Sequence, residues 1–345
     1  MHSLKLGDSD LQVSQVCLGT MTFGQQNSEA EAHEQLDFAR SQDINFIDTA
    51  ELYPVPPRAE TYSTTEAIIG RWLKRQPRDQ IILATKVAGP SRGMDWIRGG
   101  PKGLDRANIR AALDGSLQRL QTDYIDLYQI HWPARNVPMF GQYRFDPKVE
   151  PEVEPILGQL ETLDELVREG KIRYIGVSNE TPWGVCQFLK LAEERGLSRI
   201  VSVQNAYSLL NRIYEHGLAE ISYRENLALL AYSPLAFGHL SGKYLDNPQA
   251  PGRITEFPAF GQRYTKENVQ PAVAAYRELA HQHGLTPTTL ALAFVTSRPF
   301  ATLPIIGATN LDQLKENIAA CTVALTPKIL AGIEAIHLRY THPAP

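Results

Sequence analysis

The sequence is poor in cysteine and has no long apolar stretch. Its three cysteines, Cys17, Cys186 and Cys321, form no Cys-x-x-Cys pair and no zinc-ligand spacing. An odd number of widely separated cysteines in a chain of 345 residues is typical of reduced thiols in the cytoplasm, where we expect the protein. No run approaches the roughly 18 apolar residues that cross a bilayer, and polar residues near the start replace the apolar core of a signal peptide. We therefore expect no membrane partner.

An excess of charge of one sign is also lacking. The chain has 34 basic and 38 acidic residues, a formal net charge of −4, and no basic stripe, which argues against nucleic acid as a partner. We expect no metal site, because only His131 of the nine histidines follows a strand-like run, whereas barrel hydrolases cluster histidine and carboxylate ligands there. Nothing in the sequence identifies a protein partner, so a small molecule is the expected ligand.

Short apolar, β-branched runs alternate with longer amphipathic segments. Because the runs are nearly continuous, they predict strands covered on both faces, as in parallel sheets. We predict eight strands, at Val16–Gly19, Asn45–Thr49, Ile81–Val87, Tyr124–His131, Arg173–Val177, Ile200–Gln204, Leu227–Tyr232 and Thr302–Ile306. One-sided apolar spacing predicts helices, among them Glu29–Ser41, Asn108–Leu120, Leu157–Glu169 and Thr326–Arg339.

Strand–helix alternation repeated eight times indicates an α/β fold, a closed (β/α)8 TIM barrel, in a single domain spanning residues 1–345. An open doubly wound sheet is the alternative, but no Gly-x-Gly-x-x-Gly motif follows the first strand. Residues Leu4–Val13 predict an N-terminal β-hairpin around a Gly/Asp/Ser turn. Long connections at 54–63, 133–155 and 235–264 each follow a strand, which places them at the C-terminal mouth of the barrel. The conformations of segments 133–155 and 235–264 stay open.

Four polar residues come at or just after the ends of three consecutive predicted strands. They are Asp48, Tyr53, Lys86 and His131. Each alone has an ordinary structural explanation, such as a cap, a packing group or a solvated side chain. Since parallel strands deliver their ends to one mouth, we expect the four to be neighbours.

These four groups suit the reduction of a carbonyl. Tyr53 can donate the proton that the developing alkoxide needs, and the ammonium of Lys86 lowers the phenol's pKa from about 10. Asp48 can pair with Lys86 and hold it, while His131 can hydrogen-bond the carbonyl oxygen and orient it.

Five ordered segments resemble the aldo-keto reductase family. They are Phe46–Tyr53 (FIDTAELY), Ala84–Val87 (ATKV), Leu127–Pro133 (LYQIHWP), Ile175–Asn179 (IGVSN) and Ala231–Leu235 (AYSPL). The resemblance runs from about Leu4 to Asn317, and within the family Met21–Gly24 and Tyr53–Pro57 are most similar to the bacterial Tas-type branch. It implies the barrel fold, an NADP(H) cofactor and the catalytic set Asp48, Tyr53, Lys86 and His131.

The resemblance also implies where the cofactor binds. Ser178, Asn179 and Gln204 would meet the nicotinamide carboxamide, Tyr232 would stack on its ring, and Thr20 and Met21 would lie near the nicotinamide ribose. Asp48 is a further predicted cofactor contact. Ser233, Pro234 and Leu235, at the end of the seventh strand, are further predicted cofactor contacts. The Gly-rich loop that follows would hold the pyrophosphate through Gly238, Leu240 and Lys243. The final segment would bind the adenosine part, through Gly307, Thr309, Gln313, Glu316 and Asn317.

The adenosine segment departs from the family pattern. Many members place a lysine and an arginine at the positions of Gly307 and Gln313 to hold the 2′-phosphate, and a neutral amide holds a phosphate less tightly than a guanidinium does. We predict NADP(H), and use of NADH stays open.

The sequence therefore predicts an NADP(H)-dependent oxidoreductase that reduces aldehydes or ketones. The alternative within the family is a regulatory protein that binds NADPH with little turnover. A flavin or phosphosugar barrel would leave Tyr53 and Lys86 unexplained. For the substrate we predict contacts with Tyr53, His131, Trp132 and Tyr207, and the substrate itself does not follow from the sequence.

Overall fold

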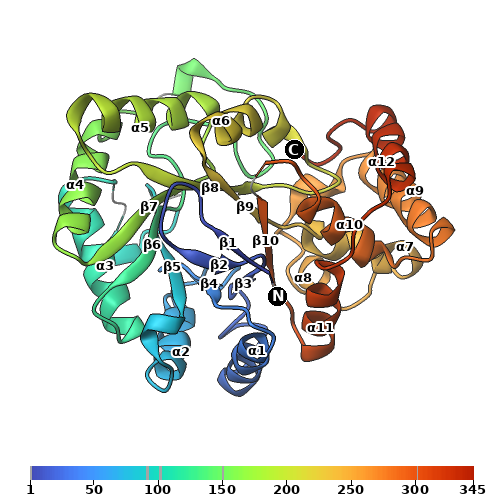
Figure 1. The fold of residues 1–345 in the computed structure, drawn as a ribbon, viewed down its shortest axis with the longest axis horizontal. Helices are drawn as coiled ribbons and strands as arrows, with labels where there is room; N and C mark the ends of the chain where they lie inside the picture. Colours follow the sequence, from blue (N-terminus) through green and yellow to red (C-terminus); the bar gives the residue numbers. More distant parts are fainter. Residues whose placement is uncertain (1, 91–92, 101–102, 150, 301) are drawn as a thin grey trace.

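The computed structural model describes residues 2–90, 93–100, 103–149, 151–300 and 302–345. Within these residues, eight parallel strands close into a barrel in the order β10-β3-β4-β5-β6-β7-β8-β9 (Figure 1). The strands are β3 (Cys17–Gly19), β4 (Phe46–Asp48), β5 (Ile82–Val87), β6 (Ile125–Ile130), β7 (Ile172–Ser178), β8 (Ile200–Ala206), β9 (Ala228–Tyr232) and β10 (Thr302–Ile306). Each coincides with a predicted run, so the predicted barrel is confirmed.

Helices surround the barrel and cover the outer faces of its strands (Figure 1). They are α1 (Glu29–Ser41), α2 (Thr64–Leu73), α3 (Arg106–Leu120), α4 (Ile156–Arg168), α5 (Pro182–Arg195), α6 (Leu218–Glu225), α9 (Val269–Gln282), α10 (Pro287–Thr296), α11 (Leu311–Ala320) and α12 (Pro327–Arg339). The short helices α7 (Lys243–Asp246) and α8 (Arg253–Glu256) belong to the connection between β9 and α9. Helix α1 has its predicted bounds. A reciprocal capping box fixes its start, because Ser28 accepts from the Glu31 N–H while the Glu31 carboxylate accepts from the Ser28 N–H.

The predicted N-terminal hairpin is present and closes the amino-terminal end of the barrel. Strands β1 (Ser3–Lys5) and β2 (Gln12–Ser14) pair in antiparallel fashion. At the turn, Gly7 has φ +53°, and a Cβ there would lie 2.2 Å from the carbonyl oxygen of Val201, so the close approach to the barrel requires glycine. Apolar side chains of the hairpin and of the barrel interior form one buried cluster, which includes Leu6, Leu11, Val13, Cys17, Phe46 and Leu127.

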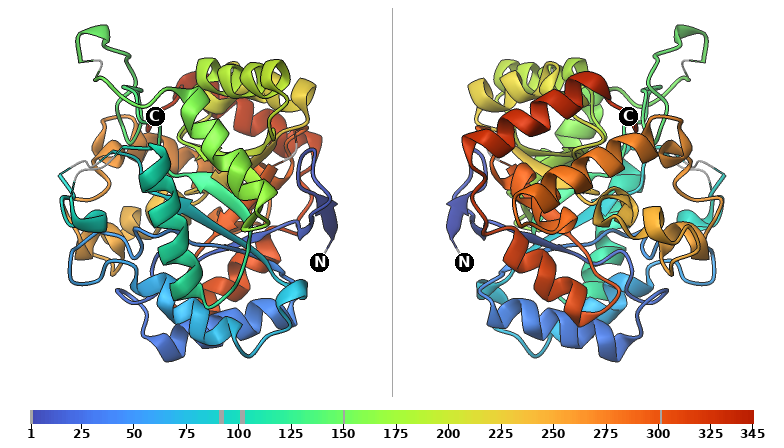
Figure 2. Two further views of the ribbon diagram at one scale, coloured as in Figure 1. Left: turned by 90° about the vertical axis from the view of Figure 1, so that its left-hand side faces the viewer. Right: turned by 90° about the vertical axis from the view of Figure 1, so that its right-hand side faces the viewer.

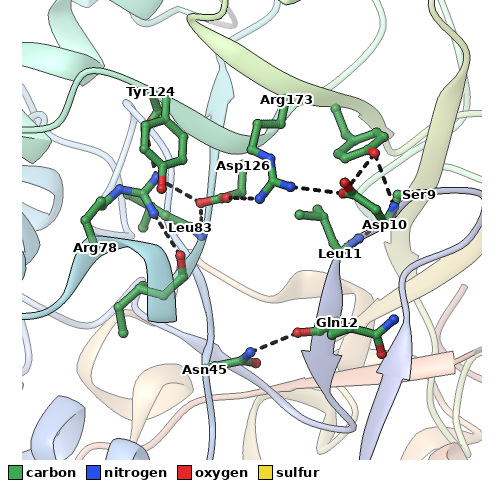
Figure 3. Close-up of polar contacts among 12 residues, drawn as sticks. Ser9, Asp10, Leu11, Gln12, Asn45, Arg78, Leu83, Tyr124, Asp126 and Arg173 are labelled. Atoms are coloured by element: carbon green, nitrogen blue, oxygen red, sulfur yellow. Dashed lines mark hydrogen bonds and ion pairs between the residues drawn. The ribbon is translucent and has the colours of Figure 1, made fainter.

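A network of charged side chains links the N-terminal hairpin to strands β6 and β7 of the barrel (Figure 3). The buried carboxylate of Asp126 pairs with Arg78 at 2.8 Å and with Arg173 at 3.0 Å, and accepts the backbone N–H of Leu83. Arg173 reaches on to Asp10 of the hairpin turn at 3.0 Å. The network therefore stabilises the amino-terminal end of the barrel (the barrel floor), which lies opposite the predicted site.

The long connections lie at the opposite end of the barrel from the hairpin (Figure 2). The segment after β6 projects from the body of the molecule, and of its predicted range 133–155, Glu150 lies outside the described residues. The connection after β9 folds into short helices, among them the 3₁₀ helices η5 (Ala236–Ser241) and η6 (Gln262–Thr265). In the described part of the chain, no helix is both long and apolar enough to span a membrane.

Candidate active site

The four predicted catalytic residues meet at the mouth of the barrel. The Nζ of Lys86 donates to Asp48 Oδ1 at 2.6 Å and to the Thr49 carbonyl at 2.8 Å, and lies 3.4 Å from the Tyr53 hydroxyl. The rings of Tyr53 and His131 meet edge to face, with centroids 5.6 Å apart. Asp48 and Lys86 are almost completely buried, whereas Tyr53 and His131 retain a small exposed face. The Tyr53 phenol and the His131 imidazole therefore face a common space, and the buried Lys86–Asp48 ion pair lies behind the phenol.

Strand alternation explains why these side chains meet. Side chains two residues apart on a strand share a face, and Phe46, Ala84 and Leu127 belong to the cluster inside the barrel. Asp48 and Lys86 follow two residues after Phe46 and Ala84, so they also point inward.

The same alternation identifies a residue that the motifs did not single out. Gln129 lies two residues before His131 and points into the barrel, where its Nε2 donates to Asp48 Oδ2 at 3.0 Å. Gln204 Nε2 donates to the same oxygen at 2.9 Å. Asp48 therefore has both oxygens occupied, one by the ammonium and one by two amides.

Burial shifts the pKa values of the site. Burial alone would lower the pKa of Lys86, but Asp48 and Tyr53 outweigh it and leave that pKa raised. Burial raises the pKa of Tyr53, and Lys86 offsets part of this rise. Lys86 thus acts in the predicted direction but does not bring the phenol's pKa below its ordinary value. Burial, aided by Lys86, holds the pKa of His131 well below its ordinary value, so the imidazole is neutral at pH 7.

A cavity of about 640 Å³ opens beside Tyr53 and His131. Its volume lies in the range typical of small-molecule sites. Nearly all predicted ligand contacts line it, namely Thr20, Met21, Asp48, Tyr53, His131, Trp132, Ser178, Asn179, Gln204, Tyr232, Ser233, Pro234, Leu235, Gly238, Lys243, Gly307, Thr309, Gln313, Glu316 and Asn317. Lys86 lies behind this surface.

Polar side chains next to the catalytic residues form a linked group of amides and hydroxyls. Asn179 donates through Nδ2 to the His131 carbonyl at 2.9 Å and accepts from the Tyr232 hydroxyl at 2.7 Å. The Ser178 hydroxyl donates to the Gln204 carbonyl at 2.7 Å. Such a set of donors and acceptors fits a carboxamide, which needs both.

A cationic segment of the cavity wall follows β9. Lys243 and Arg253 lie beside Gly238 and Gly252, where a Cβ added to Gly252 would lie 2.5 Å from the Lys243 Nζ. Arg253 Nε is buried and has no hydrogen-bond partner among the described residues, and the guanidinium lies 4.8 Å from the centre of the Phe237 ring. Two cations beside a glycine-rich backbone fit a pyrophosphate. The sequence motifs did not single out Arg253, although it directly follows a glycine within the long loop.

The far end of the cavity lies at the start of α11. Thr309 donates to Gln313 Oε1 through its N–H at 3.0 Å and through its hydroxyl at 3.1 Å, while Asn310 caps the helix. Asn317 donates to the Gly307 carbonyl at 3.2 Å. Hydroxyl, amide and helix N-terminus together present donors that suit the sugar and phosphate of an adenosine group.

The structure does not bring two of the predicted ligand residues to the cavity. Tyr207 is buried in the outer layer, where it stacks on Phe294 with centroids 5.8 Å apart and hydrogen-bonds Glu215. It is therefore a packing residue, contrary to the predicted substrate contact. Leu240 is likewise buried in the core and does not line the cavity, because η5 turns its side chain toward the protein interior.

A buried carboxylate between Asp48 and Tyr53 holds the catalytic loop in place. Glu51 accepts the Ala88 N–H at 2.6 Å, pairs with Arg98 and accepts the Tyr62 hydroxyl at 3.2 Å. Burial raises its pKa, and Arg98 opposes that rise. The motif contains Glu51, but the sequence alone did not reveal that it connects the tyrosine loop to the loop after β5.

Comparisons with known proteins agree with the geometry. A model of the aldo/keto reductase family matches residues 15–337. The chain is 52% identical to "Protein tas" of Escherichia coli (strain K12) over the whole of both chains. It is 34% identical to "Uncharacterized oxidoreductase YrpG" of Bacillus subtilis (strain 168), over 97% of this chain and 96% of that protein. It is 29% identical to "NADH-specific methylglyoxal reductase" of Escherichia coli (strain K12), over 94% of this chain and 95% of that protein.

Proposed function

Because the chain belongs to the aldo/keto reductase family, we propose that this oxidoreductase reduces aldehydes or ketones to alcohols with NADP(H), using Tyr53 as the proton donor. The observation that carries the proposal is that Tyr53 and His131 share one face of the cavity while Lys86 lies behind Tyr53. Alkoxide formation needs a nearby acid and a hydrogen-bond donor, and these groups supply both.

Each residue has a distinct role in the proposed reaction. Tyr53 binds the carbonyl oxygen and transfers its hydroxyl proton as negative charge develops there. Lys86 stabilises the phenolate that remains, and Asp48 keeps Lys86 charged and in position. His131, neutral at pH 7, donates one N–H to the same oxygen and orients the carbonyl. A nicotinamide bound at Asn179 and Gln204 would supply the hydride.

The residues of the cavity wall are chemically suited to a dinucleotide cofactor. The Asn179 and Gln204 amides suit the carboxamide of nicotinamide, and Lys243 and Arg253 suit the pyrophosphate. We place the adenosine at Thr309 and Gln313, where the helix start favours a 2′-phosphate. We therefore favour NADP(H), although one relative is named as NADH-specific.

Parallel titrations test the cofactor and the reaction. Quenching of protein fluorescence by NADPH and by NADH gives the two dissociation constants, and a panel of aldehydes and ketones is then assayed with the preferred cofactor. We expect tighter binding of NADPH and its oxidation in the presence of an aldehyde. Tight binding without oxidation would instead identify a regulatory protein, and tighter binding of NADH would overturn the cofactor assignment.

A further inference from the structure

One cation at the cavity has no role in the proposed reaction. Arg263 belongs to η6 and lines the same cavity as Tyr53 and His131. Its guanidinium interacts with the hydroxyl groups of Tyr232 and Tyr264, and no carboxylate in the described part of the chain pairs with it. Neutral hydroxyls leave its positive charge uncompensated.

The acidic side chains of the cavity wall cannot supply that compensation. Asp48 is already bonded to Lys86, Gln129 and Gln204. Glu316 accepts the Thr286 hydroxyl at 3.2 Å, at the adenosine end. A partly buried guanidinium without a counter-charge is costly, so an anionic ligand would bind favourably beside Arg263.

Arg263 has packing neighbours that differ from those of the proposed phosphate contacts. Lys243 and Arg253 gather around Gly252. Arg263 instead packs against the loop after β6, since a Cβ added to Gly141 would lie 3.2 Å from the Arg263 Cβ. That loop also carries Phe140, which lines the cavity.

A continuous wall joins Arg263 to the catalytic end. Arg263, Tyr232, Asn179 and His131 all line the cavity. The Tyr232 hydroxyl donates to Asn179, and Asn179 donates to the carbonyl of His131. Because Arg263 lines the same cavity as Tyr53 and His131, a ligand whose carbonyl oxygen meets Tyr53 can extend over the nicotinamide proposed at this wall and reach Arg263 with its far end. Trp132 and Phe140 add apolar surface to the same cavity.

We infer that Arg263 is a specificity residue that selects carbonyl substrates bearing a carboxylate. This inference rests on the proposed reductase activity and names the substrate class for the same site. The planar guanidinium can bind both oxygens of a carboxylate, which a lysine cannot do equally well. Hydrogen bonds of this kind to a charged group correspond to a preference on the order of 10- to 100-fold over a neutral analogue.

Matched substrate pairs test the inference through steady-state kinetics with NADPH. One pair is 4-carboxybenzaldehyde and 4-methylbenzaldehyde, and the other is 4-oxobutanoate and butanal. The native enzyme should show a kcat/KM at least about 10-fold higher for the acid of one pair, mainly through KM. Arg263→Met should abolish that preference and change the kcat/KM of the neutral partner by less than about 3-fold. Arg263→Lys should keep part of it.

Arg253→Met serves as the matched control, because it removes a neighbouring cation from the proposed phosphate contacts. It should weaken NADPH binding and leave the acid-to-neutral ratio unchanged, whereas Arg263→Met should leave NADPH binding unchanged. Equal kcat/KM for acid and neutral partners in the native enzyme would overturn the inference. An equal loss for both partners in Arg263→Met would show that Arg263 only supports Tyr232.

A binding measurement separates this inference from the proposed function. Titration calorimetry of the NADP⁺ complex with benzoate needs no turnover. If Arg263→Met weakens benzoate binding at least about 10-fold, the result supports the carboxylate site even if no aldehyde is reduced. Benzoate binding that is absent, or equal in both proteins, contradicts the site, while failure of every carbonyl in the kinetic assay contradicts the proposed reaction.

Discussion

Replacing Asp48 with asparagine should destabilise the fold by about 3–5 kcal/mol at pH 7, because it leaves the Lys86 ammonium buried without a counter-charge. Asp48 accepts from Lys86 at 2.6 Å through one oxygen and from Gln129 and Gln204 at 3.0 and 2.9 Å through the other. An asparagine would turn its NH₂ group either toward the ammonium or toward the two amides. A donor then faces a donor in either orientation.

Titration of Lys86 sets an upper limit on this loss. Without Asp48, burial dominates and the pKa of Lys86 falls, so the folded variant can release the proton. At pH 7 that release costs about 5 kcal/mol, from an unfolded pKa of about 10.4 and 1.36 kcal/mol per unit. The unfolded variant then binds more protons than the folded one, so its stability should recover by about 1.4 kcal/mol per pH unit above pH 7. In the native protein the pKa of Lys86 is raised, and the pair's contribution is lost only above the ordinary lysine pKa.

Urea unfolding followed by tryptophan fluorescence at pH 7 and pH 9 measures this effect. Asp114→Asn is the matched control, since it breaks the exposed Asp114–Lys171 pair at 3.0 Å and should cost about 0.5 kcal/mol or less. A loss below about 1 kcal/mol for Asp48→Asn at pH 7 would refute the reasoning. A loss that is the same at pH 9 would refute the titration argument.

Three further predictions concern pH, the barrel floor and the cofactor. Burial, and secondarily the charge of Lys86, keeps the pKa of His131 well below its ordinary value. The pH profile of kcat/KM for reduction should therefore show no titration near pH 6.5. A change of kcat/KM near pH 6.5 that disappears in His131→Gln would contradict this. Asp126→Ala removes a carboxylate partner from Arg78 and from Arg173 and the acceptor of the Leu83 N–H. It should cost about 3 kcal/mol in urea unfolding, against about 1 kcal/mol or less for Asp10→Ala. Gln313→Arg should tighten NADPH binding by about 10-fold, measured by fluorescence titration, with NADH binding unchanged.

Much of the fold follows from local patterns in the sequence. β10 and α1 have their predicted bounds because strong local signals coincide there, an apolar β-branched run in one and a capping box in the other. That the predicted catalytic residues lie together was predictable for a topological reason. Parallel strands bring Asp48, Lys86 and His131 to the same end, whatever the details of the loops.

Other features depend on contacts that sequence spacing does not encode. Tyr207 follows a strand as Trp132 does, but it packs against Phe294 while Trp132 lines the cavity. Arg253 and Arg263 lie in a long loop without regular periodicity, so their position at the cavity depends on how that loop folds back. The sequence also predicts a lowered pKa for Tyr53, whereas the pKa is raised because burial outweighs the nearby Lys86 ammonium.

The most direct test of the proposed mechanism is NADPH oxidation by Tyr53→Phe with an aldehyde that the native enzyme reduces. The variant removes one hydroxyl and keeps the ring that packs against His131. We expect kcat to fall by about 100-fold or more, as for loss of a general acid, while the dissociation constant for NADPH stays within about 2-fold. Near-native aldehyde reduction by a variant that still binds NADPH would contradict the role of Tyr53 as the proton donor.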